Sequence, residues 1–67
     1  MFIEVKRSKG DFMIVNLTKI LLCSEIDGKM RIELEDGTPI NTVYTRDELV
    51  DIFHSFGVAY VIQERRN

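Results

Sequence analysis

Two Asp-Gly pairs, at positions 27–28 and 36–37, separate short runs of alternating apolar and polar residues. Such pairs between alternating runs predict β-hairpins, because glycine, and to a lesser degree aspartate, adopts the positive φ that tight turns need. Side chains alternate between the two faces of a strand, so the turn also fixes which of them face the core. The two turns therefore predict three antiparallel strands within residues 20–43.

The length of the loop at Asp27-Gly28 decides the register of the first of these hairpins. A two-residue loop places Ile32 opposite Cys23, whereas a three-residue loop that ends in Gly28 places Ile32 opposite Leu22. We choose the three-residue loop because it matches apolar residues with apolar residues along the strand. The same rule at residues 35–37 places Ile40 opposite Ile32.

This register predicts two faces for the three strands. The first face carries Ile20, Leu22, Met30, Ile32, Leu34 and Ile40. The second carries Arg31, Glu33 and Asn41 together with Leu21, Cys23 and Val43. Apolar residues therefore remain on both faces.

A further hairpin precedes this region. Residues 2–7 alternate, residues 8–10 form a turn that ends in glycine, and a second alternating run follows. A three-residue loop pairs Val5 with Met13 and Ile3 with Val15. We therefore expect these two strands to extend the same antiparallel sheet.

A helix follows the strands, over about residues 46–56. Thr45 and Glu48 have the spacing of a capping box, in which each side chain bonds the backbone amide of the other. An apolar stripe at helical spacing comes next: Leu49, Ile52, Phe53 and Phe56. Gly57 ends the helix, and residues 58–62 (Val-Ala-Tyr-Val-Ile) are typical of a strand.

The sequence thus predicts an α+β fold in a single domain of residues 1–67. An antiparallel β-meander of about five strands carries one helix from the C-terminal half of the chain, packed on one face, and one final short strand follows. A chain of 67 residues has a small core, and oligomerisation often supplements such a core. The single cysteine excludes an internal disulfide, and one histidine with one cysteine excludes a zinc site of the usual kind.

Charge and composition argue against nucleic-acid binding, membrane insertion and secretion. The net charge is −2 and both signs are interspersed, which gives no electrostatic reason to expect nucleic acid. No apolar run approaches the length of a membrane span, and the N-terminus lacks the pattern of a secretory signal. A lone free thiol fits a reducing compartment, so we expect a cytoplasmic protein.

The residues that could carry chemistry have simpler explanations. His54 and Cys23 have no partners at catalytic spacing, so we interpret them as a helix histidine and a small apolar filler. Glu33, Glu35 and Asp36 could approach a cation, but Asp36-Gly37 is explained by its turn and no metal-binding loop is present. We therefore predict that the protein is not an enzyme and uses no cofactor or metal.

One stretch resembles a known family. Residues 15–20 (Val-Asn-Leu-Thr-Lys-Ile), followed by residues 28–37, resemble the short flagellar FlbD-like proteins and small uncharacterised bacterial and phage proteins of the same shape. That resemblance implies a strand, an Asn-Leu-x-x-Ile bend, further strands and a closing helix over roughly residues 2–56. More distantly, the early part is similar to the start of LytTR-type DNA-binding domains. Neither resemblance implies a functional residue here.

We expect a small interaction module that acts by self-association, most simply as a two-fold homodimer, and by binding another protein. The candidate interface consists of Phe12, Ile14, Leu21, Cys23, Val43, Val58, Tyr60 and Val61. The final strand could pair within the chain or with another chain.

The alternative is a small nucleic-acid-binding regulator that uses a basic hairpin tip and a basic C-terminus. Its candidate contacts are Lys6, Arg7, Lys9, Arg65 and Arg66.

Overall fold

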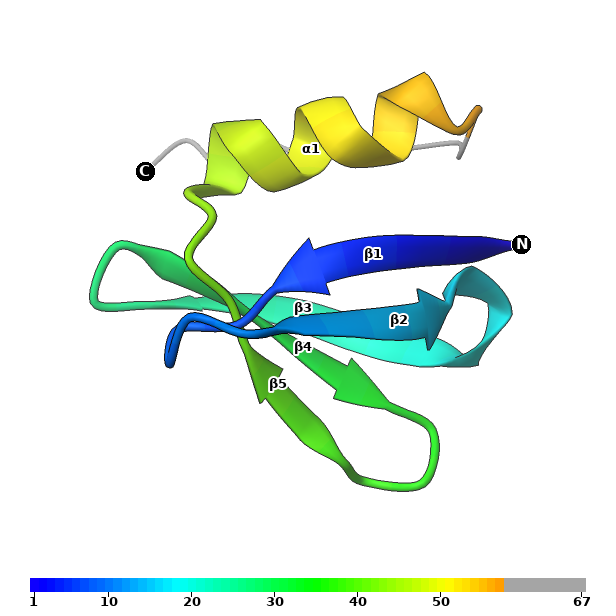
Figure 1. Cartoon of the computed structure of the whole chain (residues 1–67), viewed down its shortest axis with the longest axis horizontal. Helices are drawn as coiled ribbons and strands as arrows, with labels where there is room; N and C mark the ends of the chain where they lie inside the picture. The colour runs from blue at the N-terminus through cyan, green and yellow to red at the C-terminus, as the bar shows by residue number, and fades with distance from the viewer. Residues whose placement is uncertain (58–67) are drawn as a thin grey trace, which may run out of the picture.

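The computed structural model describes residues 1–57 and shows five strands, a short 3-10 helix and one α-helix (Figure 1). In chain order these are β1 (Phe2–Lys6), β2 (Phe12–Asn16), η1 (Leu17–Lys19), β3 (Ile20–Ile26), β4 (Lys29–Leu34), β5 (Pro39–Asn41) and α1 (Arg46–Ser55). The predicted α+β class with antiparallel strands is confirmed. The predicted final strand at residues 58–62 lies outside the described residues.

The first hairpin has the predicted register. Ile3 pairs with Val15 and Val5 pairs with Met13. The three-residue loop closes where the Arg7 N–H donates to the Asp11 carbonyl at 2.7 Å. Gly10 supplies the positive φ, 101°, that this loop requires.

The predicted register of the second hairpin is wrong. Asp27 and Gly28 both have positive φ, 53° and 80°, and form a two-residue turn, so Cys23 rather than Leu22 pairs with Ile32. A bulge at Leu21 then restores Ile20 to a position opposite Leu34. Leu22 is consequently 45% exposed instead of facing the core.

The third hairpin follows the prediction. Ile32 pairs with Ile40, and the Leu34 N–H donates to the Thr38 carbonyl at 3.0 Å across a three-residue loop. β5 has three residues, and the chain bends at Val43, just beyond the bridge residue Thr42.

The predicted single meander is replaced by two sheets, β1-β2 and β3-β4-β5. They are joined where Arg7 forms a β-bridge with Thr42. Beside this bridge the Ser8 N–H donates to the Asn41 carbonyl at 2.8 Å, and the Val43 N–H donates to the Lys6 carbonyl at 3.2 Å. The chain after β5 therefore pairs with the end of β1 while it still bonds Met30 of β4.

Thr42 sits at this crossing and is 1% exposed. Its hydroxyl donates to the Met30 carbonyl at 2.7 Å and accepts the Tyr44 N–H at 3.2 Å. The Tyr44 carbonyl in turn accepts the Met30 N–H at 2.8 Å. The side chain of Thr42 thus gives the Tyr44 N–H an acceptor and adds a second donor to the Met30 carbonyl, which already accepts the Thr42 N–H.

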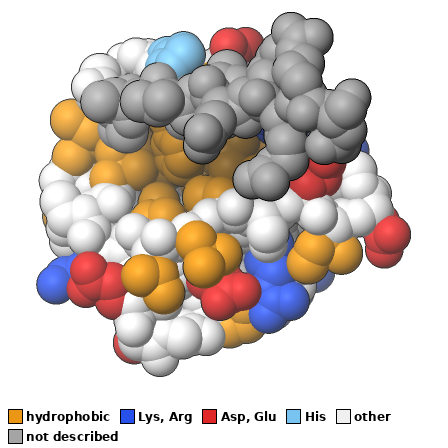
Figure 2. Space-filling view, turned by 180° about the vertical axis from the view of Figure 1, so that it is seen from behind, with side chains coloured by type: hydrophobic (Ala, Val, Ile, Leu, Met, Phe, Trp, Pro, Cys, Tyr) orange, Lys and Arg blue, Asp and Glu red, His pale blue; other side chains and the backbone are white. Residues whose placement is uncertain are grey.

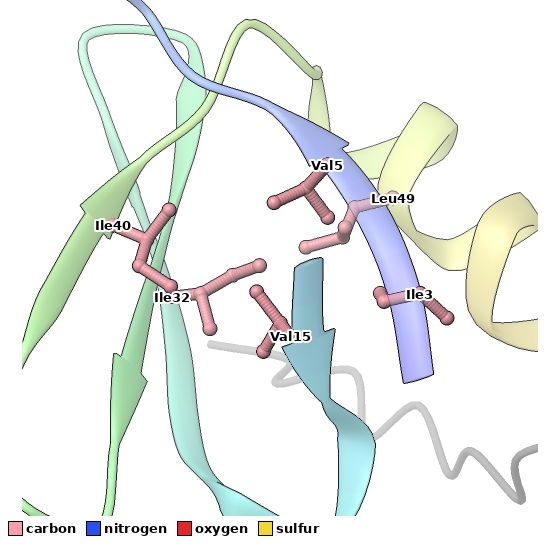
Figure 3. Packing of buried hydrophobic residues seen from close by; sticks show 6 residues of the cluster. All are labelled: Ile3, Val5, Val15, Ile32, Ile40 and Leu49. Atoms are coloured by element: carbon pink, nitrogen blue, oxygen red, sulfur yellow. The ribbon is translucent and has the colours of Figure 1, made fainter. Parts of the chain in front are cut away.

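The core lies between the two sheets, as Figure 3 shows. It consists of Ile3, Val5, Val15, Ile32, Ile40 and Leu49. Each fully buried aliphatic side chain stabilises the fold by about 1.5–3 kcal/mol relative to its exposed state. β1, β2, β4, β5 and α1 all contribute, so the core ties the two sheets and the helix together.

The helix begins as predicted. The Thr45 hydroxyl accepts the Glu48 N–H at 3.3 Å, and the Glu48 carboxylate accepts the Thr45 N–H at 2.8 Å. Leu49 is buried, and Ile52 and Phe53 pack against the core. Phe56, which the predicted stripe includes, is 42% exposed at the C-cap.

Candidate interaction surfaces

The outward side of the first hairpin carries three large apolar side chains. Phe2, Phe12 and Ile14 are 65%, 59% and 69% exposed. Because inward and outward residues alternate, the same register that buries Ile3 and Val5 places these three on one face. We call this surface the hairpin face.

Pairing across the hairpin makes the hairpin face continuous. Ile14 is two residues from Phe12 on β2 and lies diagonally across from Phe2, which pairs with Asn16. Glu4 lies opposite Ile14, and Lys6 lies opposite Phe12 with its Nζ 5.9 Å from the centroid of the Phe12 ring. An apolar strip is therefore flanked by one acidic and one basic side chain.

β3 exposes a second set of apolar residues. Leu21 is 62% exposed at the bulge, and Leu22 and Ile26 are 45% and 47% exposed. Leu22 and Ile26 occupy alternate positions opposite Glu33 and Lys29, so they stand on the outward side of the second sheet among charged neighbours.

A groove of about 420 Å³ lies between α1 and the β3–β4 hairpin. Its lining is mainly apolar and includes Cys23, Met30, Leu49 and Phe53. Figure 2 shows hydrophobic side chains gathered on this rear side of the molecule. We call it the helix groove.

Cys23 lines the helix groove rather than an exposed sheet face. Burial raises the pKa of its thiol. A raised pKa lowers the fraction of thiolate, which is the opposite of what a nucleophilic cysteine requires. This agrees with its interpretation as an apolar filler.

Not all of the basic side chains predicted at the tip of the first hairpin are available to contact nucleic acid. The Arg7 guanidinium forms a bidentate ion pair with Asp11, and its Nε lies 2.8 Å from Asp11 Oδ1. That hydrogen bond lowers the pKa of Asp11 and raises the pKa of Arg7. Lys6 stands over Phe12, and Lys9 is exposed in the loop. Residues 65 and 66 lie outside the described part of the chain.

The three acidic residues considered as a cation site have other partners. Asp36 Oδ1 accepts the Thr38 N–H at 2.9 Å, which lowers the pKa of Asp36. Glu35 lies 3.9 Å from Lys19 Nζ, and Glu33 lies 3.8 Å from Arg31 Nε. Within residues 1–57, no group of three or more His, Cys, Asp or Glu side chains could hold a metal ion. His54 is exposed in the last turn of α1.

The structure separates the predicted interface residues. Phe12, Ile14 and Leu21 are exposed, whereas Cys23 and Val43 are half-buried. The predicted positions 58, 60 and 61 lie outside the described residues. The sequence analysis did not include Phe2, although the register predicted for the first hairpin places it on the same face as Ile14.

Comparison with known proteins leaves these surfaces as the basis for assigning a function. No family model, curated protein or solved structure matches the chain. Among residues 1–57, no helix is long and apolar enough to cross a membrane. The resemblance to FlbD-like proteins stays a prediction.

Proposed function

We propose that the protein is a small non-catalytic interaction module that associates with a second copy of itself through the hairpin face. The observation that carries this proposal is the exposure of Phe2, Phe12 and Ile14 on one side of a single hairpin. Isolated exposed apolar residues are common, but a contiguous set with a polar rim is typical of an interface.

Charge favours a second copy as the partner. Glu4 and Lys6 flank the strip, so the hairpin face contains one residue of each sign. A two-fold interface brings the same surface together from both copies, and Glu4 of one copy can then approach Lys6 of the other. The small core of a 67-residue chain gives the association a further role, because burial between copies adds to stability.

We also propose a cytoplasmic location, and the lone cysteine supports it. Cys23 is free and lines an apolar groove, which fits a reducing compartment such as the cytoplasm. Binding of a different protein by the same surface is the related activity that we expect of such a module.

Sedimentation equilibrium of the full chain over a range of concentrations tests the proposal. We expect the parent to show a concentration-dependent dimer and Ile14→Glu to be monomeric at the same concentrations, since the substitution places a charge in the middle of the strip. Leu21→Glu is the matched control, because Leu21 has similar exposure but belongs to β3. A strictly monomeric parent would contradict the proposal. Loss of the dimer in Leu21→Glu, with the dimer kept in Ile14→Glu, would place the interface on β3 instead.

A further inference from the structure

The hairpin face ends beside a hollow of about 550 Å³, which lies where β2 and β4 both end (Figure 1). Two residues of the hairpin face, Phe2 and Ile14, form part of its lining. Leu34 contributes apolar surface from the end of β4, and Glu35 and Asp36 line the hollow from the loop that follows. We call it the end hollow. It is an apolar depression with an acidic side, and it is continuous with the proposed interface.

Local hydrogen bonds hold the walls of the end hollow. Asn16 is the last residue of β2, and its Oδ1 accepts the Thr18 N–H at 3.1 Å and the Thr18 hydroxyl at 2.9 Å. The Asn16 side chain is therefore directed toward η1 and does not project from the sheet as Ile14 does. On the other side, the Glu35 N–H donates to the Lys19 carbonyl at 2.8 Å, which holds the end of β4 against η1. The hollow is thus formed before any partner binds.

An aromatic ring projects from the opposite end of the hairpin face. Phe12 is 59% exposed, and Lys6 Nζ lies 5.9 Å from the centroid of its ring. The charges at the end hollow have the opposite balance, because one basic residue, Lys19, lines it together with two acidic residues, Glu35 and Asp36. The hairpin face therefore has a basic projection at one end and an acidic hollow at the other.

We propose that Phe12 of a second copy occupies the end hollow, so that each copy supplies one ring and one hollow. This inference rests on the proposed self-association through the hairpin face and specifies how the two copies align. A two-fold axis that crosses β1 and β2 at Ile14 reverses the strand direction in the second copy. Phe12 and Asn16 lie on either side of Ile14 at the same distance, two residues or about 7 Å along β2. The axis therefore places each Phe12 over the Asn16 end of the other copy, beside its hollow.

Size and chemistry fit the ring to the hollow. A cavity of about 150 Å³ admits benzene, so a volume of about 550 Å³ leaves room for a phenyl ring and for part of the Lys6 side chain. The ring contacts Phe2 and Leu34 there, and apolar surface is removed from water on both copies. Lys6 arrives with the ring and approaches Glu35 and Asp36, which carry the opposite charge.

Charge disfavours the other two-fold alignment of the same surface. An axis parallel to the strands places β1 of one copy over β2 of the other, so Phe12 lies over Lys6 and away from the end hollow. The two Lys6 side chains then meet at one end of the interface, where like charges repel. The crossing axis separates these lysines and brings each of them to an acidic hollow.

Exchange of charge between two variants of the full chain tests the alignment. Lys6→Glu makes the projection acidic, and Glu35→Lys changes the hollow from one basic and two acidic residues to two basic and one acidic. In sedimentation equilibrium, each variant alone should have a dimer Kd about tenfold above that of the parent, because like charges meet at both hollows. An equimolar mixture should recover the Kd of the parent, because opposite charges meet at both hollows of the heterodimer. Native mass spectrometry with one variant isotope-labelled identifies the heterodimer.

Asp51→Lys on α1 is the matched control. It gives the chain the same net charge as Glu35→Lys, but Asp51 is exposed and does not line the end hollow. Alone it should dimerise as the parent does, and added to Lys6→Glu it should not restore the Kd of the parent. No recovery with Glu35→Lys, while the parent is dimeric and Ile14→Glu is monomeric, would overturn the alignment and leave self-association through the hairpin face standing. A monomeric parent would overturn both.

Contacts between copies of the parent give a second readout that needs no substitution. In a mixture of isotope-labelled and unlabelled copies, filtered NOE spectra report only contacts between the two. We expect the Phe12 ring of one copy to contact the Leu34 methyl groups of the other. Contacts from Phe12 to Lys6 of the other copy, with none to Leu34, would overturn the proposal in favour of the axis parallel to the strands.

Discussion

Thr42 forms the backbone bridge between the two sheets, and its side chain bonds Met30 and Tyr44 beside that bridge. Thr42→Val isolates the contribution of the side chain. Valine has nearly the same shape, so the substitution leaves no cavity, but it removes the hydroxyl that accepts the Tyr44 N–H and donates to the Met30 carbonyl. The Met30 carbonyl keeps the Thr42 N–H as a donor at 3.0 Å. The Tyr44 N–H is therefore the group that loses its partner.

The expected magnitude follows from these contacts. An orphaned donor costs about 1–3 kcal/mol, and the added apolar methyl offsets about 0.8 kcal/mol of that. We expect Thr42→Val to lower the free energy of unfolding by about 0.2–2 kcal/mol. A chain of 67 residues has a total stability of about 3–10 kcal/mol, so a loss at the upper end of this range is a large fraction of the whole.

Urea unfolding followed by far-ultraviolet circular dichroism, at one fixed low protein concentration, measures this change. Thr38→Val is the matched control, because Thr38 is exposed and valine keeps the backbone N–H that donates to Asp36. We expect the control to change stability by less than about 0.5 kcal/mol. If Thr42→Val is neutral or stabilising while the control is unchanged, the hydroxyl does not support the crossing between the sheets.

Three further predictions concern the helix and the first hairpin. Thr45→Ala removes one half of the capping box and should cost about 1 kcal/mol by urea unfolding, and a neutral result would contradict the cap. Leu49→Ala truncates the helix residue that is 2% exposed and should cost about 2–5 kcal/mol by the same measurement, whereas a cost below about 1 kcal/mol would place it outside the core. The pKa of Asp11 should be below its ordinary value and should rise in Arg7→Gln when the carboxyl is titrated by NMR. Because that pKa is depressed in the folded state, the ion pair contributes stability above the unfolded pKa, and the contribution is lost as the pH falls through the folded value.

Each hairpin register was predicted correctly only where apolar and polar residues alternate strictly along the strands. The first hairpin was predicted correctly because its alternation around Gly10 allows only one register that buries both Ile3 and Val5. The second was not, because residues 20–23 form an unbroken apolar run, so the hydrophobic pattern fits either register. The left-handed conformation of Asp27 and the bulge at Leu21 then decide the pairing.

The hydrophobic pattern of the sequence could not predict that the five strands divide into two sheets, for a different reason. The bridge between Arg7 and Thr42 joins residues far apart in the chain, and neither residue type indicates such a contact. The capping box, by contrast, is a local arrangement of two side chains at fixed spacing, and it was predicted in full. The helix groove was missed because it depends on the pairing of Cys23, which the incorrect register had placed on the other face.

The chemical shifts of backbone amides during dilution test self-association through the hairpin face most directly. The account predicts that amides of β1 and β2 on either side of Ile14, together with Phe2, shift progressively with concentration, and that amides of β3 do not. The same dilution of Ile14→Glu should leave the β1 and β2 amides unchanged. Shifts confined to residues 20–26, or no shifts at any concentration up to the high micromolar range, would contradict the account.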